Sequence, residues 1–180
     1  HNIAHYWEMQ QMLRGKPAPS HGASVGVATL LVWPIFERFA TEDISNLDID
    51  AIRSHRIGHD ERVKWMIHAY GEANARVIMD DNPGDFLSWD EQLRRIRRAQ
   101  ERISDIRQAI ALLPPYQQIL DAMTRLGAPL TPAECGIDDE LLNMSMHCAK
   151  DYRTRYTLFK LIDECGLTDK YLSGYPLATR

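Results

Sequence analysis

Histidines are the side chains in this sequence best suited to hold a metal ion, and three of them lie near its start. The chain has seven histidines among 180 residues, so their spacing must decide which of them matter. His1 and His5 are four residues apart, which places both on one face of a helix. His21 stands where a second helix is expected to begin, and the positive end of the helix dipole there disfavours a protonated imidazole. A neutral ring keeps a nitrogen lone pair available for a divalent metal ion.

Two of these histidines are candidate ligands of a single ion. The loop over residues 14–20 is short enough to bring His1 and His21 together. Zinc binds histidine nitrogen at about 2.0–2.1 Å, and a catalytic zinc site normally has three protein ligands and one open position. The pair therefore supplies two ligands at most. The same spacing also fits histidines that cap a helix or fill a core, and both interpretations stay open on spacing alone.

A second possible metal site centres on the dipeptide His59-Asp60. Helical metal-dependent phosphohydrolases use such a dipeptide together with a histidine upstream and an aspartate downstream. The candidates for those two places are His21 or His55, and Asp80 or Asp105. Because aspartate is also a preferred residue at a helix N-terminus, the dipeptide equally fits the start of a helix.

Basic side chains gather in two stretches with different expected roles. Arg153 and Arg155 stand between Tyr152 and Tyr156, which suggests partial burial, and they are candidates for binding a substrate phosphate. Pairing with acidic helix ends is the alternative. Another group of arginines alternates with acidic residues along one expected helix, which favours a solvated, ion-paired surface over nucleic-acid binding; these are Arg94, Arg95, Arg97, Arg98, Arg102 and Arg107.

Helices must position these side chains, because apolar residues recur at steps of three and four and no run of alternating β-branched residues occurs. Pro34 is expected to kink or end the second helix, and the stretch 80–85 to interrupt the chain. Capping boxes are expected at 88–91 and 131–134, and the tail after Gly166 is expected to be loose. The sequence predicts an all-α, multi-helix bundle with helices over residues 2–13, 21–34, a short one from 48, 60–79, 89–113, 116–126, 139–150 and 153–165.

Composition limits the class of protein. Hydrophobic residues make up 44% of the chain, enough for one folded domain over residues 1–180, and the net charge of −4 argues against a strongly basic nucleic-acid binder. The longest apolar stretch, residues 23–36, is shorter than the roughly 20 residues of a membrane span. Three widely spaced cysteines fit free thiols in a reducing cytosol. We therefore expect a soluble, cytoplasmic protein with no membrane or nucleic-acid partner.

The segments HNIAHYWEM and SHGASVGVAT, residues 1–9 and 20–29, carry a family resemblance. The sequence resembles the C-terminal, helical half of sn-glycerol-1-phosphate dehydrogenases of the AraM type. These enzymes are part of the larger superfamily of iron-containing alcohol dehydrogenases, glycerol dehydrogenase and dehydroquinate synthase. A weaker match covers residues 127–137 and 153–167, whereas residues 40–112 match only in being helical.

The resemblance implies a metal centre and a nucleotide cofactor. In such enzymes His1 and His21 would be two of three ligands to a divalent metal ion, most often zinc, with nickel or iron as alternatives. The third ligand, an aspartate, and the NAD(P)-binding domain would precede this chain. No G-x-G-x-x-G motif occurs in these 180 residues. The chain would then be the metal-binding domain of a two-domain dehydrogenase, inactive by itself.

The resemblance also implies a reaction and a partner. The full-length enzyme would reduce dihydroxyacetone phosphate to sn-glycerol 1-phosphate in phospholipid metabolism, and it would act as a homo-oligomer, namely a dimer. His5 would contact the substrate or relay a proton, and Glu8 would orient His5 or His1. Lys16, Arg153 and Arg155 are the candidates for the substrate phosphate. A glycerol dehydrogenase or dehydroquinate synthase relative, a His-Asp phosphohydrolase and a non-catalytic interaction module remain the alternatives.

Overall fold

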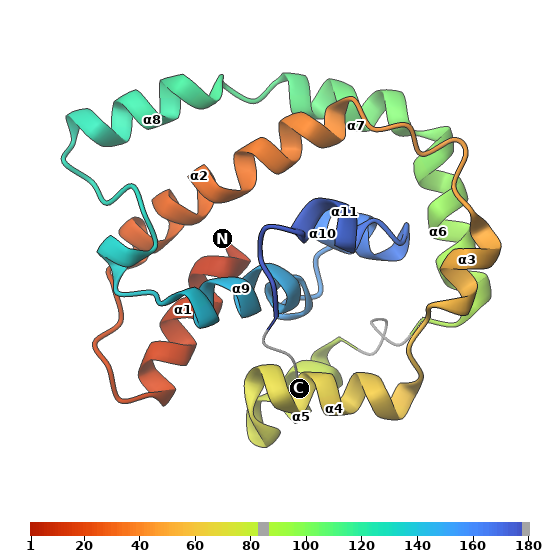
Figure 1. Ribbon diagram of the computed structural model, residues 1–180, viewed down its shortest axis with the longest axis horizontal. Coiled ribbons are helices and arrows are strands. Elements are labelled where there is room, and N and C mark those ends of the chain that lie inside the picture. The colour runs from red at the N-terminus through yellow and green to blue at the C-terminus, as the bar shows by residue number, and fades with distance from the viewer. Residues whose placement is uncertain (83–86, 178–180) are drawn as a thin grey trace. The chain divides into compact units, whose positions relative to one another are not determined.

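The computed structural model describes residues 1–82 and 87–177, and it is helical (Figure 1). Helices make up 69% of the structure, and the described ranges contain no strand, which confirms the all-α prediction. The chain divides into two compact units. Unit 1 comprises residues 1–42, 104–149 and 175–180, and unit 2 comprises residues 43–103 and 150–174. That all 180 residues form one domain stays a prediction.

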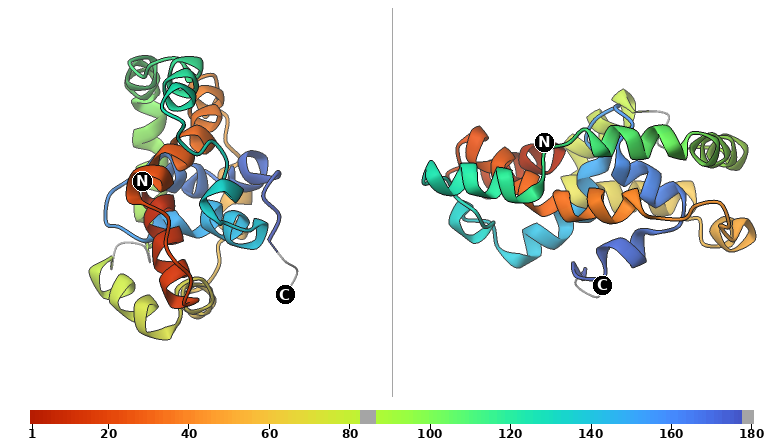
Figure 2. Two further views of the ribbon diagram at one scale, coloured as in Figure 1. Left: turned by 90° about the vertical axis from the view of Figure 1, so that its left-hand side faces the viewer. Right: turned by 90° about the horizontal axis from the view of Figure 1, so that it is seen from above.

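Unit 1 holds the histidines at the start of the chain. Its first helix, α1, packs between α2 and α9, and α8 runs alongside α2 (Figures 1 and 2). The indole of Trp7 is fully buried in this unit, and its Nε1 donates to Ser145 Oγ on α9 at 2.9 Å. The helices are α1 (Asn2–Leu13), α2 (His21–Ala40), α7 (Ile103–Ala111), α8 (Tyr116–Arg125) and α9 (Asp139–Cys148), with a short 3-10 turn, η2 (Ala133–Cys135).

Unit 2 is built from two separate stretches of the chain that pack together. Helix α4 packs on α5, and α10 packs on both α6 and α11. The side-chain amide of Gln92 on α6 donates to the Glu164 carbonyl of α10 at 2.8 Å, which links the two stretches. The helices are α3 (Ile49–Ser54), α4 (His59–Tyr70), α5 (Glu72–Asp81), α6 (Trp89–Glu101), α10 (Leu158–Glu164) and α11 (Thr168–Leu172); a 3-10 turn, η3 (Ala149–Asp151), precedes the second stretch.

Several expected helix starts are confirmed by their hydrogen bonds. Asp48 caps α3 by accepting from the Ala51 amide, and Ser88 caps α6 by accepting from the Glu91 amide. The reciprocal bonds of the capping box at 131–134 also form, since Glu134 Oε2 accepts from the Thr131 amide at 2.8 Å. That box begins only the three-residue η2 turn.

The bounds of three long helices differ from prediction. Pro34 was expected to kink or end the second helix, and the end is wrong: α2 continues through Pro34 to Ala40. Pro34 lies on the exposed side, where water can bind the carbonyl left without an amide partner. The helix expected over 60–79 breaks at Gly71, whose φ of +74° suits glycine alone. The helix expected over 89–113 breaks at Arg102, and its apolar steps of three and four continue across that break without revealing it.

The C-terminal part also differs from expectation. The helix expected over 153–165 begins only at Leu158, where Thr157 caps it by accepting from the Lys160 amide. The tail after Gly166 was expected to be loose, but it contains α11. Of the break expected over 80–85, residues 83–85 lie outside the described residues.

Helix α2 meets the length and composition of a membrane-spanning helix, although its apolar part alone was judged too short. The core helix of a soluble protein meets the same test. Its buried side chains include Val27, Trp33 and Phe39. The three cysteines are buried, and the structure forms no disulfide between them, as expected for thiols.

Candidate metal centre

The start of α1 and the start of α2 bring three histidines together. The ring centroids of His1 and His5 lie 4.4 Å apart, those of His1 and His21 5.2 Å apart, and those of His5 and His21 5.1 Å apart. Figure 1 places the start of the chain beside α2. One ligand nitrogen from each ring lies within 4.8 Å of the other two. The expectation that α1 and α2 would place His1 near His21 is confirmed.

Local structure explains this geometry. His1 precedes the first turn of α1, and His5 follows one turn later on the same face, with its amide donating to the His1 carbonyl at 3.1 Å. His21 is the first residue of α2, after Ser20, whose hydroxyl accepts from the Ala23 amide. The packing of α1 against α2 then sets the three rings side by side.

The donor set fits a divalent metal ion of the zinc type. Two ligands at 2.0–2.1 Å from one zinc ion are at most about 4.2 Å apart, so small rotations of the exposed rings suffice to close the cluster. His1 and His21 are exposed and His5 is partly exposed, so the rings have room to turn. Imidazole nitrogen suits zinc, iron and nickel alike, and the donors themselves do not select among these metals.

Glu8 connects the two helices at this cluster. Its Oε1 lies 2.9 Å from His21 Nδ1, and its Oε2 lies 3.5 Å from His5 Nδ1. Orientation of His5 by Glu8 was one of the two expected arrangements. The contact with His21 was missed because it depends on how α1 packs on α2. The only sign of it in the sequence is that Glu8 shares a helix face with His5.

The three candidate phosphate ligands are exposed side chains. Lys16 lies in the loop between α1 and α2. Arg153 and Arg155 belong to unit 2, and because they are exposed the expected partial burial is wrong; Arg153 lies over the ring of Tyr152, 4.9 Å from its centroid. That these residues bind a substrate phosphate stays a prediction.

The dipeptide His59-Asp60 forms the first turn of α4, as the structural interpretation of this motif expects. Within residues 1–82 and 87–177, the histidines at 1, 5 and 21 form the one group of three or more metal-ligating side chains with this spacing. The structure therefore gives no support to the phosphohydrolase alternative.

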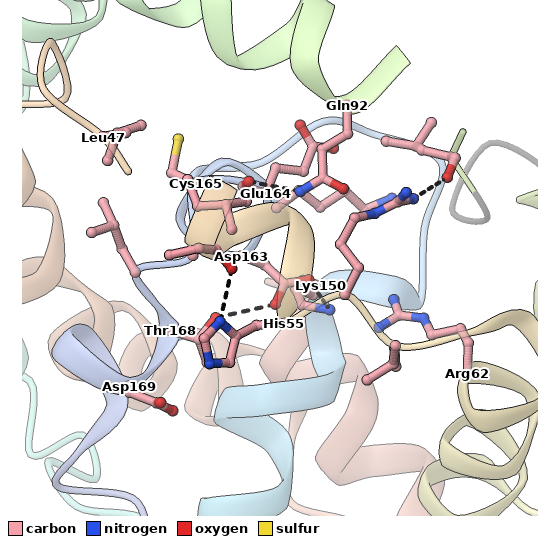
Figure 3. Close-up of a pocket in the computed structure, with 18 of the residues that line it drawn as sticks. Leu47, His55, Arg62, Gln92, Lys150, Asp163, Glu164, Cys165, Thr168 and Asp169 are labelled. Atoms are coloured by element: carbon pink, nitrogen blue, oxygen red, sulfur yellow. Dashed lines mark hydrogen bonds and ion pairs between the residues drawn. The ribbon is translucent and has the colours of Figure 1, made fainter. Parts of the chain in front are cut away.

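Unit 2 has a cavity of about 840 Å³, and ionic side chains form part of its lining (Figure 3). Arg62 donates to Asp151 Oδ1 at 2.6 Å, and Lys150 Nζ contacts the same oxygen at 2.9 Å. Lys150 Nζ also lies 3.2 Å from Asp163 Oδ2. Two cations and two carboxylates thus neutralise one another, which indicates a structural role for this ionic cluster of Arg62, Lys150, Asp151 and Asp163.

Acid should weaken this ionic cluster. Burial raises the pKa of Asp163, but Lys150 and Arg62 outweigh it and hold that pKa below its ordinary value. The ionised Asp163 carboxylate therefore stabilises the folded state fully above its unfolded pKa of about 3.9. This stabilisation is lost as the pH falls through the lower pKa of the folded state. We expect Asp163→Asn to lower the urea midpoint at pH 7 and the difference from wild type to shrink below pH 4. A difference that stays constant from pH 7 to pH 3 would contradict this; Asp80→Asn, exposed on α5, is the control.

The known proteins most informative for this chain share one name. A protein from Geobacillus stearothermophilus named glycerol-1-phosphate dehydrogenase, NAD(P)+, is 24% identical over 165 residues, which cover 91% of this chain and 32% of that protein. The protein of the same name from Geobacillus thermodenitrificans is 24% identical over 94% of this chain and 33% of its own length. The chain is similar to proteins named glycerol-1-phosphate dehydrogenase. This confirms the resemblance seen in the two histidine segments.

The chain spans about a third of the length of these glycerol-1-phosphate dehydrogenases. A further relative of that name, from Halalkalibacterium halodurans, is 31% identical over 41% of the chain and 19% of its own length. No family model matches the chain, and no solved structure matches it.

Proposed function

We propose that this chain is the metal-binding helical domain of an NAD(P)-linked dehydrogenase that interconverts dihydroxyacetone phosphate and sn-glycerol 1-phosphate. The observation that carries the proposal is the meeting of His1, His5 and His21 at the contact between α1 and α2. The names of the relatives support the reaction class and the NAD(P) cofactor.

In this proposal His1 and His21 hold a divalent metal ion, with zinc as the expected metal. An aspartate and the NAD(P)-binding domain come from another part of a longer protein. When bound, such an ion supplies Lewis-acid polarisation of a carbonyl or alkoxide oxygen. His5, one turn along α1 from His1, hydrogen-bonds the substrate oxygen or passes a proton to it in this proposal.

The substrate in this proposal is a small phosphorylated ketone or alcohol. Lys16, Arg153 and Arg155 are exposed cations and are the candidates for its phosphate. We further propose a cytoplasmic, homo-oligomeric parent enzyme that contacts neither nucleic acid nor membrane. By itself the 180-residue chain should bind metal and show no turnover.

Metal titration tests the ligand assignment. Zinc or nickel is titrated into the chain in competition with a chromophoric chelator. We expect His21→Ala to weaken binding more than about tenfold, the least that loss of a supporting residue at a metal site typically costs. His68→Ala removes an exposed histidine of α4 and should bind like wild type. Equal affinity of wild type and His21→Ala would overturn the assignment.

A further inference from the structure

We propose that Glu8 is the positioning residue of this metal site: its carboxylate sets the tautomer of His21 and orients the rings of both His5 and His21. The inference rests on the proposed function, because it concerns the same three histidines. It adds a residue that contacts two of these rings and sets which nitrogen of His21 is available.

The geometry shows one carboxylate shared by two rings from two helices. Glu8 Oε1 lies 2.9 Å from His21 Nδ1 on α2, and Glu8 Oε2 lies 3.5 Å from His5 Nδ1 on α1. Both contacts are made to Nδ1, and the one with His21 is a hydrogen bond. Because an ionised carboxylate only accepts hydrogen bonds, His21 Nδ1 must carry the hydrogen. The lone pair of the neutral His21 ring is then on Nε2.

Nε2 is therefore the atom that the His21 ring presents to a metal ion. Histidine ligands of metal sites commonly donate their other ring N–H to a carboxylate, which fixes the ring and raises its basicity. His21 needs such support, since 51% of its side chain is exposed and the neighbouring Gly22 has no heavy atom within 4 Å of an added Cβ. The Glu8 side chain is only 20% exposed and is better fixed than the ring it holds.

Glu8 acts through the histidines in this arrangement. In the described part of the chain, the group of candidate ligand atoms consists of the three imidazoles and does not include the Glu8 carboxylate. Glu8 is also the only acidic residue of α1, so no neighbouring carboxylate on that helix can replace it.

Two readouts on the full chain test the role. The first is the affinity for zinc, measured by chelator competition in wild type, Glu8→Gln, Glu8→Ala and Glu37→Gln; the last removes an exposed carboxylate of α2. We expect Glu8→Ala to weaken binding by about 10- to 100-fold. Glu8→Gln should be intermediate, because its carbonyl oxygen can accept from one ring while its amide cannot accept from the other. Glu37→Gln should match wild type.

The second readout is the His21 tautomer in the metal-free chain, observed by ¹⁵N–¹H correlation of the imidazole nitrogens. Wild type should show hydrogen on Nδ1, and Glu8→Ala should show mainly hydrogen on Nε2, the tautomer favoured by an unrestrained ring. An unchanged tautomer in Glu8→Ala would overturn the inference, as would unchanged zinc affinity. If wild type bound no zinc, the ligand assignment would fail separately, and the tautomer would still decide the role of Glu8.

Discussion

Replacing Asp151 with alanine is expected to destabilise unit 2 by about 3–5 kcal/mol, the cost of breaking a buried ion pair by removing one partner. The Asp151 side chain is 2% exposed and accepts from both Arg62 and Lys150. Its removal leaves two cations of low exposure with only Asp163 to balance them. Asp151→Asn keeps the shape and removes the charge, so it should also be strongly destabilising.

Urea unfolding followed by circular dichroism measures the loss, and hydrogen exchange places it in the chain. Protection should fall most for amides of residues 150–174. Asp80→Ala removes an exposed carboxylate from the same unit and should change the stability by no more than about 0.5 kcal/mol. A loss below 1 kcal/mol for Asp151→Ala would show that the ionic cluster does not hold the two stretches of unit 2 together.

Trp7→Ala is the second change with a large expected effect, about 3–5 kcal/mol of unit 1 stability. The indole is fully buried between helices, and its loss leaves a cavity and removes the hydrogen bond to Ser145. Trp7 lies between His5 and Glu8 on α1. Loosening this helix should therefore weaken zinc binding although no candidate ligand is altered.

The matched control is Met12→Ala, which removes a 72% exposed apolar side chain from the same helix. It should change both stability and zinc affinity little. Thermal melts by circular dichroism, with and without zinc, measure both effects. If Trp7→Ala melted like Met12→Ala, α1 would not depend on its contact with α9.

Much of the histidine cluster was predictable because it depends on local structure. The bounds of α1 agree with prediction since residues 2–13 contain no helix breaker and Gly15 and Pro17 follow. His21 at the start of α2 follows from the same loop. The remaining step is the packing of α1 on α2. It follows because both helices have an apolar face to bury and the loop between them is short.

Features that depend on long-range packing were not predictable. The expected helix end at Pro34 was wrong because the effect of a proline depends on which side of α2 faces water. The sequence pattern alone does not indicate that side. The ionic cluster joins Arg62 to Asp151, 89 residues away, and neither residue stands in a pattern that indicates a partner. The bond between Glu8 and His21 likewise requires the final packing of two helices.

The division of the chain into units has a consequence for protein engineering. Unit 1, which carries the histidine cluster, is assembled from residues 1–42, 104–149 and 175–180, with the segments of unit 2 between them. No single truncation can release it. A minimal metal-binding protein would need two new junctions, one from residue 42 to 104 and one from residue 149 to 175. The same interleaving means that an insertion or deletion within 43–103 changes the tether between α2 and α7 while leaving every candidate ligand in place.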